Sequence, residues 1–458
     1  MSSVLLGIAP TRRFCFSVED AHRYKALVED RLTGLNVPFI NIDTVNEEGL
    51  LITMEDARRA AALFTEKGVD AVFVPHVNFG TEEAVATFCK KVGKPVLLWG
   101  PRDELPLEDG IRLRDTLCGL MATSNVLKKM GVPFTYLENC RIQDRVFADG
   151  VGSFLAATSA VKAFLGARIG QISTRPPNFY TVIMNEQELL SRWGVEMVPI
   201  TAHRFVAEVK RMALEDSRID AETALIARRV DVGATPVEAL RKIAAMKLFM
   251  LDWAARDSLS AIAIRCHEDI PDALECYSCF ANAEVTAAGI PVTCETDIHG
   301  ALSALLLQHA QMAFDPVFFA DITIRHPVND NGVLLWHCGN FPASLCKADA
   351  ACALKGHCNI PPGLPGTGNH EIEAGEITVC RFDGMNGEYR LFVGEGVSIQ
   401  GPYVRGTYAW MEVDDWVRWE RKLIYGPYIH HVAGARGRSA AALIEACRYI
   451  PGLSAETA

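Results

Sequence analysis

Several features that mark specialised proteins are missing from this sequence. No apolar run approaches the roughly 18 residues that a membrane-spanning helix requires. The first residues, MSSVLLGIAPTRRFCF, lack the cationic segment and long apolar core of a secretory signal. Basic residues are not in excess either, since 45 Lys and Arg face 56 Asp and Glu, which argues against a nucleic-acid-binding surface. We therefore expect a cytoplasmic protein with neither nucleic-acid nor membrane partners.

Two common binding motifs are also missing. No G-x-G-x-x-G follows the first apolar run, so nothing predicts a dinucleotide site. Fourteen cysteines without a secretion signal indicate reduced thiols. The sequence Cys276-x-x-Cys279 is compatible with a metal or redox pair. It has no second pair at zinc-finger spacing, which favours buried thiols.

Alternating strands and helices are predicted over the first three quarters of the chain. The apolar runs of the first part have the composition of buried parallel strands: VLLGIA, PFINID, AVFVPHV, PVLLWG and PFTYLE. Amphipathic helical segments separate them at the spacing that βαβ units require. A second series of the same kind begins near Ala167. We predict two doubly wound parallel-sheet α/β domains, residues 1–165 and 166–345.

The pattern changes after residue 345. A stretch rich in Pro and Gly, GHCNIPPGLPGTGNH, leads into short alternating runs: EIEAGEITVCRFD, GEYRLFVGEGVSI and GTYAWMEVD. A helix, SAAALIEACRYI, follows near the end. Residues 346–458 are therefore expected to form a small antiparallel, β-barrel-like C-terminal domain.

Residues able to carry chemistry gather in the stretch 294–340. Glu295 and Asp297 follow the apolar run IPVTC, Asp321 lies inside FFADIT, and His337 ends GVLLWH. Charged groups at buried strands need a partner, and a divalent metal would supply one. Carboxylates and imidazoles form a hard N/O donor set that suits Mn²⁺, Mg²⁺ or Co²⁺.

Most of these residues also have a purely structural explanation. Asp297 can cap the helix that follows it. Asp321 can be satisfied by backbone donors or an arginine, and His337 can be a hydrogen-bonded core histidine. The pair His430-His431 can be an ordinary strand pair with one ring facing inward. Glu295 is left without such an explanation, so it is the first choice as a metal ligand.

A pair of arginines, Arg12 and Arg13, follows the first predicted strand. Loops at the carboxyl ends of parallel strands bind ligands in such sheets. Two adjacent guanidinium groups can hold hydroxyls or an anionic group. A solvated loop with a surface ion pair is the alternative explanation.

As a set, APTRRF, CETDIHGALS, FFADIT, LLWHCGNFPASL, GTYAWMEV and PYIHHVAG resemble the L-fucose and L-arabinose isomerase family, with the closer match to its fucose-isomerase-like branch. The resemblance covers nearly the whole chain. It implies two α/β domains and a β-barrel-like C-terminal domain. It also implies a Mn²⁺-dependent aldose–ketose isomerase, usually hexameric, that acts on a small sugar. Family members act on fucose, arabinose or sulfoquinovose, and an arginine pair would suit a sulfonate or phosphate.

The resemblance also assigns roles to the metal-binding candidates. Glu295 matches a glutamate that is both ligand and acid/base, and Asp321 matches the second carboxylate. The histidine ligand late in the chain falls on the pair at 430–431, where His431 is preferred. His337 matches a ligand histidine of the arabinose branch. The expected reaction moves a proton between C1 and C2, with Glu295 and Asp321 as the catalytic pair.

Substrate contacts are expected from a second group of residues. Arg12 or Arg13 matches a substrate-contacting arginine that, in hexamers of this family, approaches a neighbouring subunit's site. His430 and Asn340 are further candidates. Neither the sugar nor the choice between an enediol route and a hydride shift follows from the sequence. A non-catalytic sugar-binding protein and a metal-dependent epimerase or aldolase are the alternatives.

Overall fold

The computed structural model describes residues 4–311, 315–348, 350–360, 363–373 and 375–458. The chain forms two compact units, Met1–Lys162 and Ala163–Ala458, and each is described by itself. Within the described residues, every helix is too short or too polar to cross a membrane. The domain borders expected at residues 165 and 345 stay predictions.

A five-stranded parallel sheet forms the centre of the first unit, in the order β2-β1-β3-β4-β5. The strands β3 and β4 are buried along their whole length, as expected of strands covered on both faces. The parallel sheet predicted here is confirmed. The elements of this unit are β1 (Leu6–Ile8), α1 (Val18–Gly34), β2 (Phe39–Ile40), α2 (Met54–Lys67), β3 (Ala71–Pro75), α3 (Glu82–Val92), β4 (Val96–Trp99), α4 (Thr116–Lys129), β5 (Thr135–Tyr136) and α5 (Arg145–Phe164), which continues into the second unit.

Local sequence explains where the helices of the first unit begin and end. In α2, Thr53 and Asp56 form a capping box at the start, and Gly68 closes the helix in the left-handed conformation with φ of 65°. In α3, Gly93 closes the helix in the same way. Both helices also carry lysines in their last turn, where a positive charge favours the helix end.

The second unit contains a four-stranded parallel sheet in the order β7-β6-β8-β9. This second parallel sheet is also confirmed. Three helices lie between β7 and β8, and the chain breaks between the first two at Asp216. The elements of this region are β6 (Arg168–Ile172), a 3₁₀ turn η1 (Tyr180–Val182), α6 (Glu186–Trp193), β7 (Glu196–Ile200), α7 (Ala202–Glu215), α8 (Ile219–Arg229), α9 (Val237–Asp257), β8 (Ala261–Ile264), α10 (Asp269–Leu274), α11 (Cys279–Ala287), β9 (Val292–Thr293) and α12 (Ile298–Ala310).

A larger mixed sheet of nine strands follows, in the order β12-β13-β16-β11-β10-β17-β14-β15-β18, and β15 also pairs with β16. The strands of this sheet that come first in the chain are β10 and β11. They pair with each other, β10 also pairs with β17 and β11 with β16, and neither pairs with the parallel sheet. The elements are β10 (Phe318–Arg325), β11 (Gly332–His337), a 3₁₀ turn η2 (Ala343–Leu345), β12 (Ala353–Gly356), β13 (Pro365–Glu371), β14 (Glu376–Met385), β15 (Glu388–Ile399), β16 (Thr407–Glu412), α13 (Trp416–Tyr425), β17 (His431–Arg436), α14 (Ala440–Cys447) and β18 (Leu453–Thr457).

The hairpin between β14 and β15 shows how turn residues set the register of this sheet. Met385 pairs with Glu388, so Asn386 and Gly387 form a two-residue turn. Both have positive φ, 54° and 85°, as the favoured hairpin turn of this length requires. Asn386 and Gly387 therefore set the register of the β14–β15 pair.

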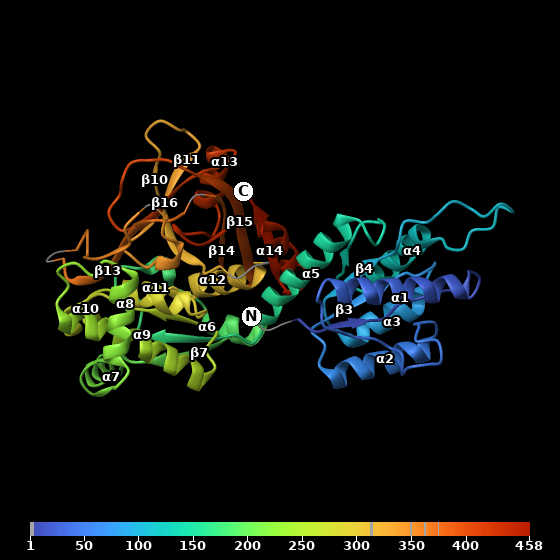
Figure 1. Ribbon diagram of the computed structural model, residues 1–458, viewed down its shortest axis with the longest axis horizontal. Helices are drawn as coiled ribbons and strands as arrows, with labels where there is room; N and C mark the ends of the chain where they lie inside the picture. Colours follow the sequence, from blue (N-terminus) through green and yellow to red (C-terminus); the bar gives the residue numbers. More distant parts are fainter. Residues whose placement is uncertain (1–3, 312–314, 349, 361–362, 374) are drawn as a thin grey trace. The chain divides into compact units, whose positions relative to one another are not determined.

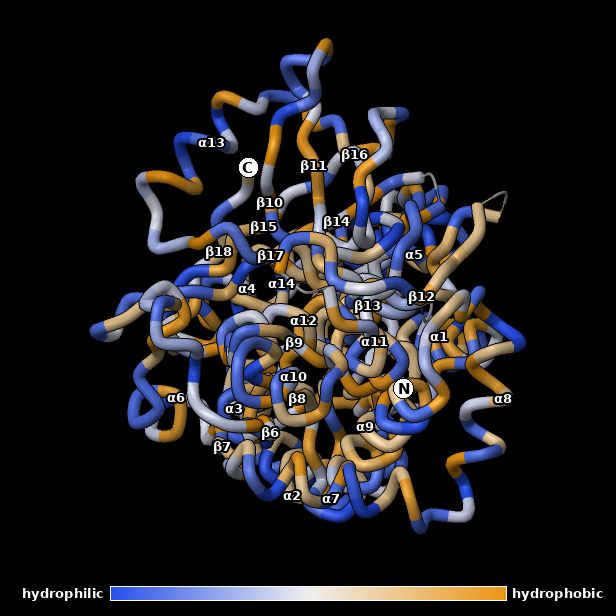
Figure 2. Tube along the Cα trace, turned by 90° about the vertical axis from the view of Figure 1, so that its left-hand side faces the viewer, coloured by the Kyte–Doolittle hydropathy of each residue, from blue (hydrophilic) through white to orange (hydrophobic). Residues whose placement is uncertain are grey.

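Helix α12 lies between the two sheets of the second unit (Figure 1). It contacts β8 and β9 on the parallel sheet and β14 and β17 on the larger sheet. Nearly every residue of α12 is buried. Hydrophobic residues gather along α12, β8 and β9, and hydrophilic residues lie mainly on the outer loops (Figure 2). The residues just before α12 are therefore held in the interior, at the junction of the two sheets.

Candidate active site

Glu295 lies in the tight connection between β9 and α12. Glu295 and Thr296 both have left-handed backbones, with φ of 53° and 55°. Backbone hydrogen bonds from Thr296 N to Ile264 O (3.1 Å) and from Asp297 N to Cys294 O (3.1 Å) hold this connection. Two consecutive left-handed residues other than glycine cost about 1–3 kcal/mol each, and such strain is concentrated at functional sites.

The two carboxylate oxygens of Glu295 have different surroundings. Oε1 lies 2.9 Å from Nε2 of His267 and accepts a hydrogen bond from the Cys266 thiol (3.3 Å). Oε2 is buried and has no hydrogen-bond partner among the described residues. It lies 3.8 Å from Nε2 of both His337 and His431. One oxygen is therefore anchored, and the other faces a group of imidazoles.

Burial and the neighbouring imidazoles act on Glu295 in opposite directions. Burial disfavours the charged form. The hydrogen bond to His267 and the electrostatic attraction of the nearby His337 and His431 imidazoles outweigh burial and hold the pKa of Glu295 well below its usual value. The carboxylate is thus ionised.

Strand pairing brings Asp321 and His431 together. Asp321 on β10 is directly opposite His431 on β17, so both side chains are on one face of the sheet. His431 Nε2 lies 3.5 Å from Asp321 Oδ1. This oxygen is buried and has no hydrogen-bond partner among the described residues, like Oε2 of Glu295. Three potential ligand atoms from three elements thus converge.

The other nitrogen of His431 is fixed by Asp297. Nδ1 lies 2.9 Å from Asp297 Oδ2, so Nδ1 carries the proton and the lone pair of Nε2 faces Glu295 and Asp321. Asp297 Oδ1 also accepts the backbone N–H of Gly300 at 2.8 Å. The helix cap expected at Asp297 is present, and the same carboxylate also orients a candidate ligand.

A buried ion network stands behind Asp297. Arg381 of β14 pairs with Asp297 and, at 2.8 Å, with Asp383. His299 Nδ1 lies 3.1 Å from Asp383 Oδ1. We call Asp297, Arg381, Asp383 and His299 the Asp297 network; all four are buried. Burial disfavours the charged forms, but the attraction between the opposite charges lowers the pKa of both carboxyl groups and raises that of Arg381.

His337 has the opposite tautomer preference. Its Nδ1 accepts the backbone N–H of Cys338 at 2.9 Å. In the neutral ring the proton therefore lies on Nε2, which faces Glu295. This arrangement suits a hydrogen-bond donor better than a metal ligand, in contrast to the role that the arabinose branch implies.

The other expected substrate contacts are placed differently. Asn340 is buried beside Cys294, to whose sulfur its amide donates at 3.4 Å. His430 is exposed, and its ring centre lies 4.3 Å from that of His431. Cys276 and Cys279, by contrast, are buried free thiols, as expected.

Arg12 and Arg13 belong to the first unit, where both have partners. Arg12 is nearly buried and forms two hydrogen bonds to Glu48, at 2.6 and 2.7 Å. Arg13 lies over the Phe79 ring at 4.1 Å and 3.6 Å from Glu82. In this unit, therefore, both guanidinium groups are already engaged with local side chains.

His431 Nε2 is near a carboxylate oxygen of both Glu295 and Asp321. Glu295 Oε2 and His431 Nε2 are 3.8 Å apart, and His431 Nε2 and Asp321 Oδ1 are 3.5 Å apart. Asp321 and His431 belong to one group of potential ligands within 4.8 Å of one another, together with His430, whereas Glu295 belongs to two neighbouring groups. Neighbouring ligand atoms of an octahedral ion are about 3 Å apart, so a shared ion would draw both carboxylates toward His431. Two oxygens and one nitrogen also match the preference of Mn²⁺ and Mg²⁺.

Sequence reasoning missed His267 and the Asp297 network. His267 follows β8, and a residue at the carboxyl end of a strand next to β9 was a usable signal. Arg381 lies in the apolar run ITVCRFD, and a guanidinium in a buried strand also requires buried partners.

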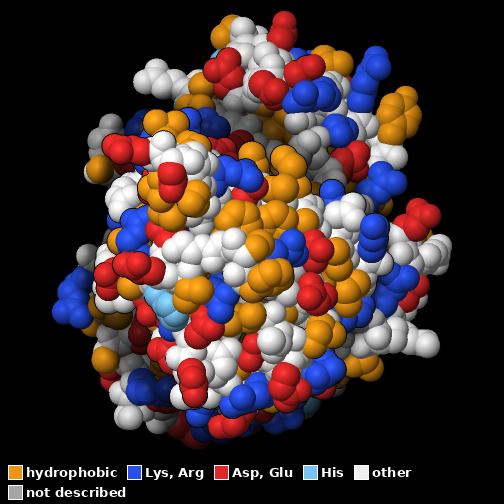
Figure 3. Space-filling model, turned by 90° about the vertical axis from the view of Figure 1, so that its right-hand side faces the viewer, with side chains coloured by type: hydrophobic (Ala, Val, Ile, Leu, Met, Phe, Trp, Pro, Cys, Tyr) orange, Lys and Arg blue, Asp and Glu red, His pale blue; other side chains and the backbone are white. Residues whose placement is uncertain are grey.

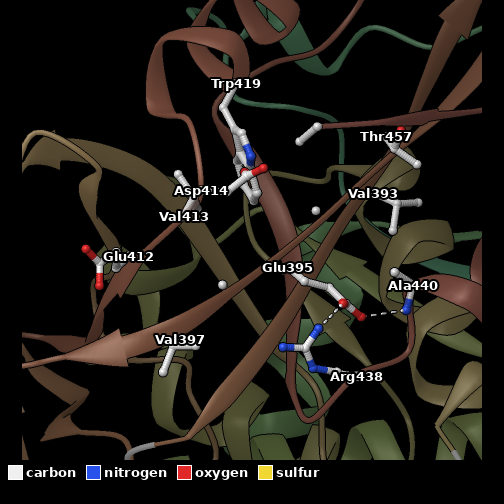
Figure 4. Close-up of a pocket in the computed structure, with 13 residues that line it drawn as sticks. Val393, Glu395, Val397, Glu412, Val413, Asp414, Trp419, Arg438, Ala440 and Thr457 are labelled. Atoms are coloured by element: carbon white, nitrogen blue, oxygen red, sulfur yellow. Dashed lines mark hydrogen bonds and ion pairs between the residues drawn. The ribbon is translucent and has the colours of Figure 1, made fainter.

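A separate pocket of about 500 Å³ in the larger sheet does not contain these residues (Figure 4). It lies along β15 beside Trp419. Its Glu395 already binds Arg438 at 3.2 Å and the backbone N–H of Ala440 at 3.1 Å. The Glu395 carboxylate is therefore satisfied, unlike the two buried carboxylate oxygens near His431.

Comparison with known proteins gives two domain matches in chain order. The model of the fucose/sulfoquinovose isomerase N-terminal domain matches residues 7–165, and that of the L-fucose isomerase C-terminal domain matches residues 335–452. Together the matches span more than half of the chain.

Curated relatives align through the middle of the chain as well. A sulfoquinovose isomerase of Priestia aryabhattai is 25% identical over 434 residues, or 90% of both chains. Those of Alkalicoccus urumqiensis and Clostridium sp. (strain MSTE9) are 28% identical over 73% and 23% identical over 79% of both chains. With both domains present in order and these relatives along most of its length, the chain belongs to the fucose/sulfoquinovose isomerase family and is an aldose–ketose isomerase.

Proposed function

We propose that this isomerase is metal-dependent and acts on a sugar of the sulfoquinovose type. One observation carries the metal dependence: Glu295 Oε2 and Asp321 Oδ1 are buried without hydrogen-bond partners among the described residues, beside His431 Nε2. Buried charged oxygens are costly unless an ion or donor satisfies them. Glu295, Asp321 and His431 are the proposed ligands of Mn²⁺, with Mg²⁺ or Co²⁺ as alternatives.

The bound ion would act as a Lewis acid toward the substrate oxygens on C1 and C2. Glu295 and Asp321 are the proposed acid/base pair, which takes a proton from one carbon and returns it to the other. The hydrogen bond to His267 fixes one oxygen of Glu295 during this exchange. His337 donates from Nε2 to a substrate oxygen, where negative charge develops.

The substrate assignment depends on the relatives. All three are named sulfoquinovose isomerases, whereas the C-terminal domain model is named for L-fucose isomerase. We propose the sulfonated sugar because the three sulfoquinovose isomerases align along most of this chain. Arg12, Arg13, His430 and Asn340 stay predicted substrate contacts.

We also infer a homo-oligomer, as in the hexamers that the family resemblance implies. Large hydrophobic side chains are exposed on the first unit around α4 and the loop before it, and hydrophobic atoms gather on that face (Figure 3). Apolar patches of this kind mark protein–protein interfaces. The residues are Leu105, Leu107, Ile111, Leu117 and Met121. The pairing of β15 with β16 supports a barrel-like C-terminal domain, and the cytoplasmic location stays a prediction.

Product analysis of metal-loaded protein tests this function. Sulfoquinovose, L-fucose, L-arabinose and D-arabinose are incubated separately in D₂O, and the products are identified by NMR. We expect the ketose of sulfoquinovose, with deuterium at C1 or C2 if the route is an enediol. Cleavage products or an inverted stereocentre would contradict the proposal, and complete absence of deuterium would favour a hydride shift.

A further inference from the structure

A second pocket of about 520 Å³ opens at the carboxyl ends of β6 and β8. The chain runs from β6 outward to β7, and from β8 outward to β9 on the opposite side. The loops after β6 and β8 therefore diverge at this point. In open parallel sheets, such a switch point is where ligands bind. None of the residues assigned above to the metal or to proton transfer lines this pocket.

Both charged side chains that line this pocket are arginines, Arg175 and Arg265. Arg175 follows β6; its NH1 donates to the carbonyls of Pro176 (3.0 Å) and Pro177 (2.9 Å), and its guanidinium lies 4.7 Å from the Tyr180 ring. It has no ion-pair partner among the described residues. Backbone bonds and ring contact thus orient a guanidinium whose charge is not neutralised.

Arg265 follows β8 and is only 12% exposed. Its Nε is buried without a hydrogen-bond partner in the described part of the chain. Glu268 and Asp269 pair with the outer nitrogens, the latter at 3.2 Å, and both carboxylates are about half exposed. When an anion replaces them on the guanidinium, both carboxylates can be solvated by water instead. The unpaired Nε is a donor that a ligand in the pocket would satisfy.

Two residues that line the pocket are neighbours in sequence of Glu295 or of a residue that contacts it. Thr296, which lines it, directly follows Glu295, and Arg265 directly precedes Cys266 and His267, which contact Glu295. Consecutive Cα atoms are about 3.8 Å apart, so a ligand here lies beside the loop that carries Glu295. For one molecule to serve both places, its anionic group would lie in the pocket and its reacting carbons at Glu295.

We propose that Arg175 and Arg265 form a binding site for a tetrahedral oxyanion, the sulfonate of the sugar substrate. This proposal deepens the function proposed above and rests on it for the identity of the ligand. A sulfonate has three acceptor oxygens and a permanent negative charge, which match two guanidinium groups. A free inorganic anion such as sulfate has the same chemistry, so the experiment must distinguish it from the sugar sulfonate as the ligand of this site.

Calorimetry with an unreactive ligand tests the site directly. The methyl glycoside of sulfoquinovose cannot open its ring and is not isomerised, so its binding is measured apart from turnover. We expect Arg175→Gln and Arg265→Gln each to weaken it about 10- to 100-fold, as loss of a charge-assisted hydrogen bond does. Arg211→Gln, on the exposed surface of α7, is the matched control and should bind it normally.

Two further ligands separate the possible outcomes. The affinity for methyl glucoside, which lacks the sulfonate, should not change in Arg175→Gln. Glycoside affinity that is unchanged in Arg175→Gln and Arg265→Gln would overturn the proposal. So would variants that lose only the binding of inorganic sulfate and still bind the glycoside normally. Arg175→Gln replaces a half-buried side chain and keeps the test valid if Arg265→Gln does not fold. If the unmodified protein binds the glycoside but isomerises no sugar, the proposed function fails and the anion site stands.

Discussion

Arg381 should be among the residues most important for stability, because it is the cation of the Asp297 network. Its side chain is completely buried and contacts the carboxylates of Asp297 and Asp383. The substitution Arg381→Met leaves both carboxylates in the interior without their cation. Removing one partner of a buried ion pair costs about 3–5 kcal/mol. With two carboxylates affected, we expect a loss at the upper end of that range in the free energy of unfolding.

Urea unfolding followed by tryptophan fluorescence measures this loss, since six of the seven tryptophans belong to the second unit. Arg438→Met is the matched control, because Arg438 is 63% exposed and pairs with Glu376 and Glu395. A surface pair of this kind contributes below about 1 kcal/mol. The double variant Arg381→Met/Asp383→Asn also removes one of the two carboxylates left unpaired. Its loss of unfolding free energy should therefore be smaller than the sum of the losses in Arg381→Met and Asp383→Asn. Equal losses for Arg381→Met and Arg438→Met would refute the reasoning.

Three other predictions concern orientation, pH and packing. Asp297→Asn should weaken Mn²⁺ binding about 10- to 100-fold, measured by electron paramagnetic resonance, because His431 loses its carboxylate partner; unchanged affinity would contradict this role. Burial lowers the pKa of His76 to about 4. The unfolded state then binds more protons below pH 6.5, so about 3 kcal/mol of stability should be lost between pH 6.5 and 4, and His76→Asn should flatten this slope in urea titrations. Gly119→Ala should lower the melting temperature, because the added Cβ would lie 1.8 Å from a backbone oxygen, whereas Gly34→Ala, in a helix with free space, should raise it.

The sequence predicted the elements of the fold well because their signals are local. Apolar runs of strand length marked both parallel sheets, and short alternating runs after residue 345 marked strands of the larger sheet. The partners of β10 and β11 were not predictable in this way. An isolated apolar run does not show whether it pairs with the preceding parallel strands or with a strand much later in the chain, as Asp321 of β10 does with His431 of β17.

The sequence suggested candidate residues for the site but not the hydrogen bonds between them. Glu295 and Asp321 were proposed because charged groups in apolar runs need partners, and His431 was proposed from the family resemblance. The role of Asp297 as a cap followed from its position before a helix. Its bond to His431 did not, because it joins residues 134 positions apart. The orientation of His337 depends on one backbone N–H, which no sequence pattern encodes.

The most direct test of the account is a titration of metal-stripped protein with Mn²⁺, in which bound metal and sulfoquinovose isomerisation are measured on the same samples. We predict activity that rises in proportion to bound Mn²⁺ and saturates at one ion per chain. Glu295→Gln should lose both tight binding and turnover. Full activity in the stripped protein, or tight Mn²⁺ binding that survives in Glu295→Gln, would contradict the assignment of Glu295, Asp321 and His431 as the metal centre.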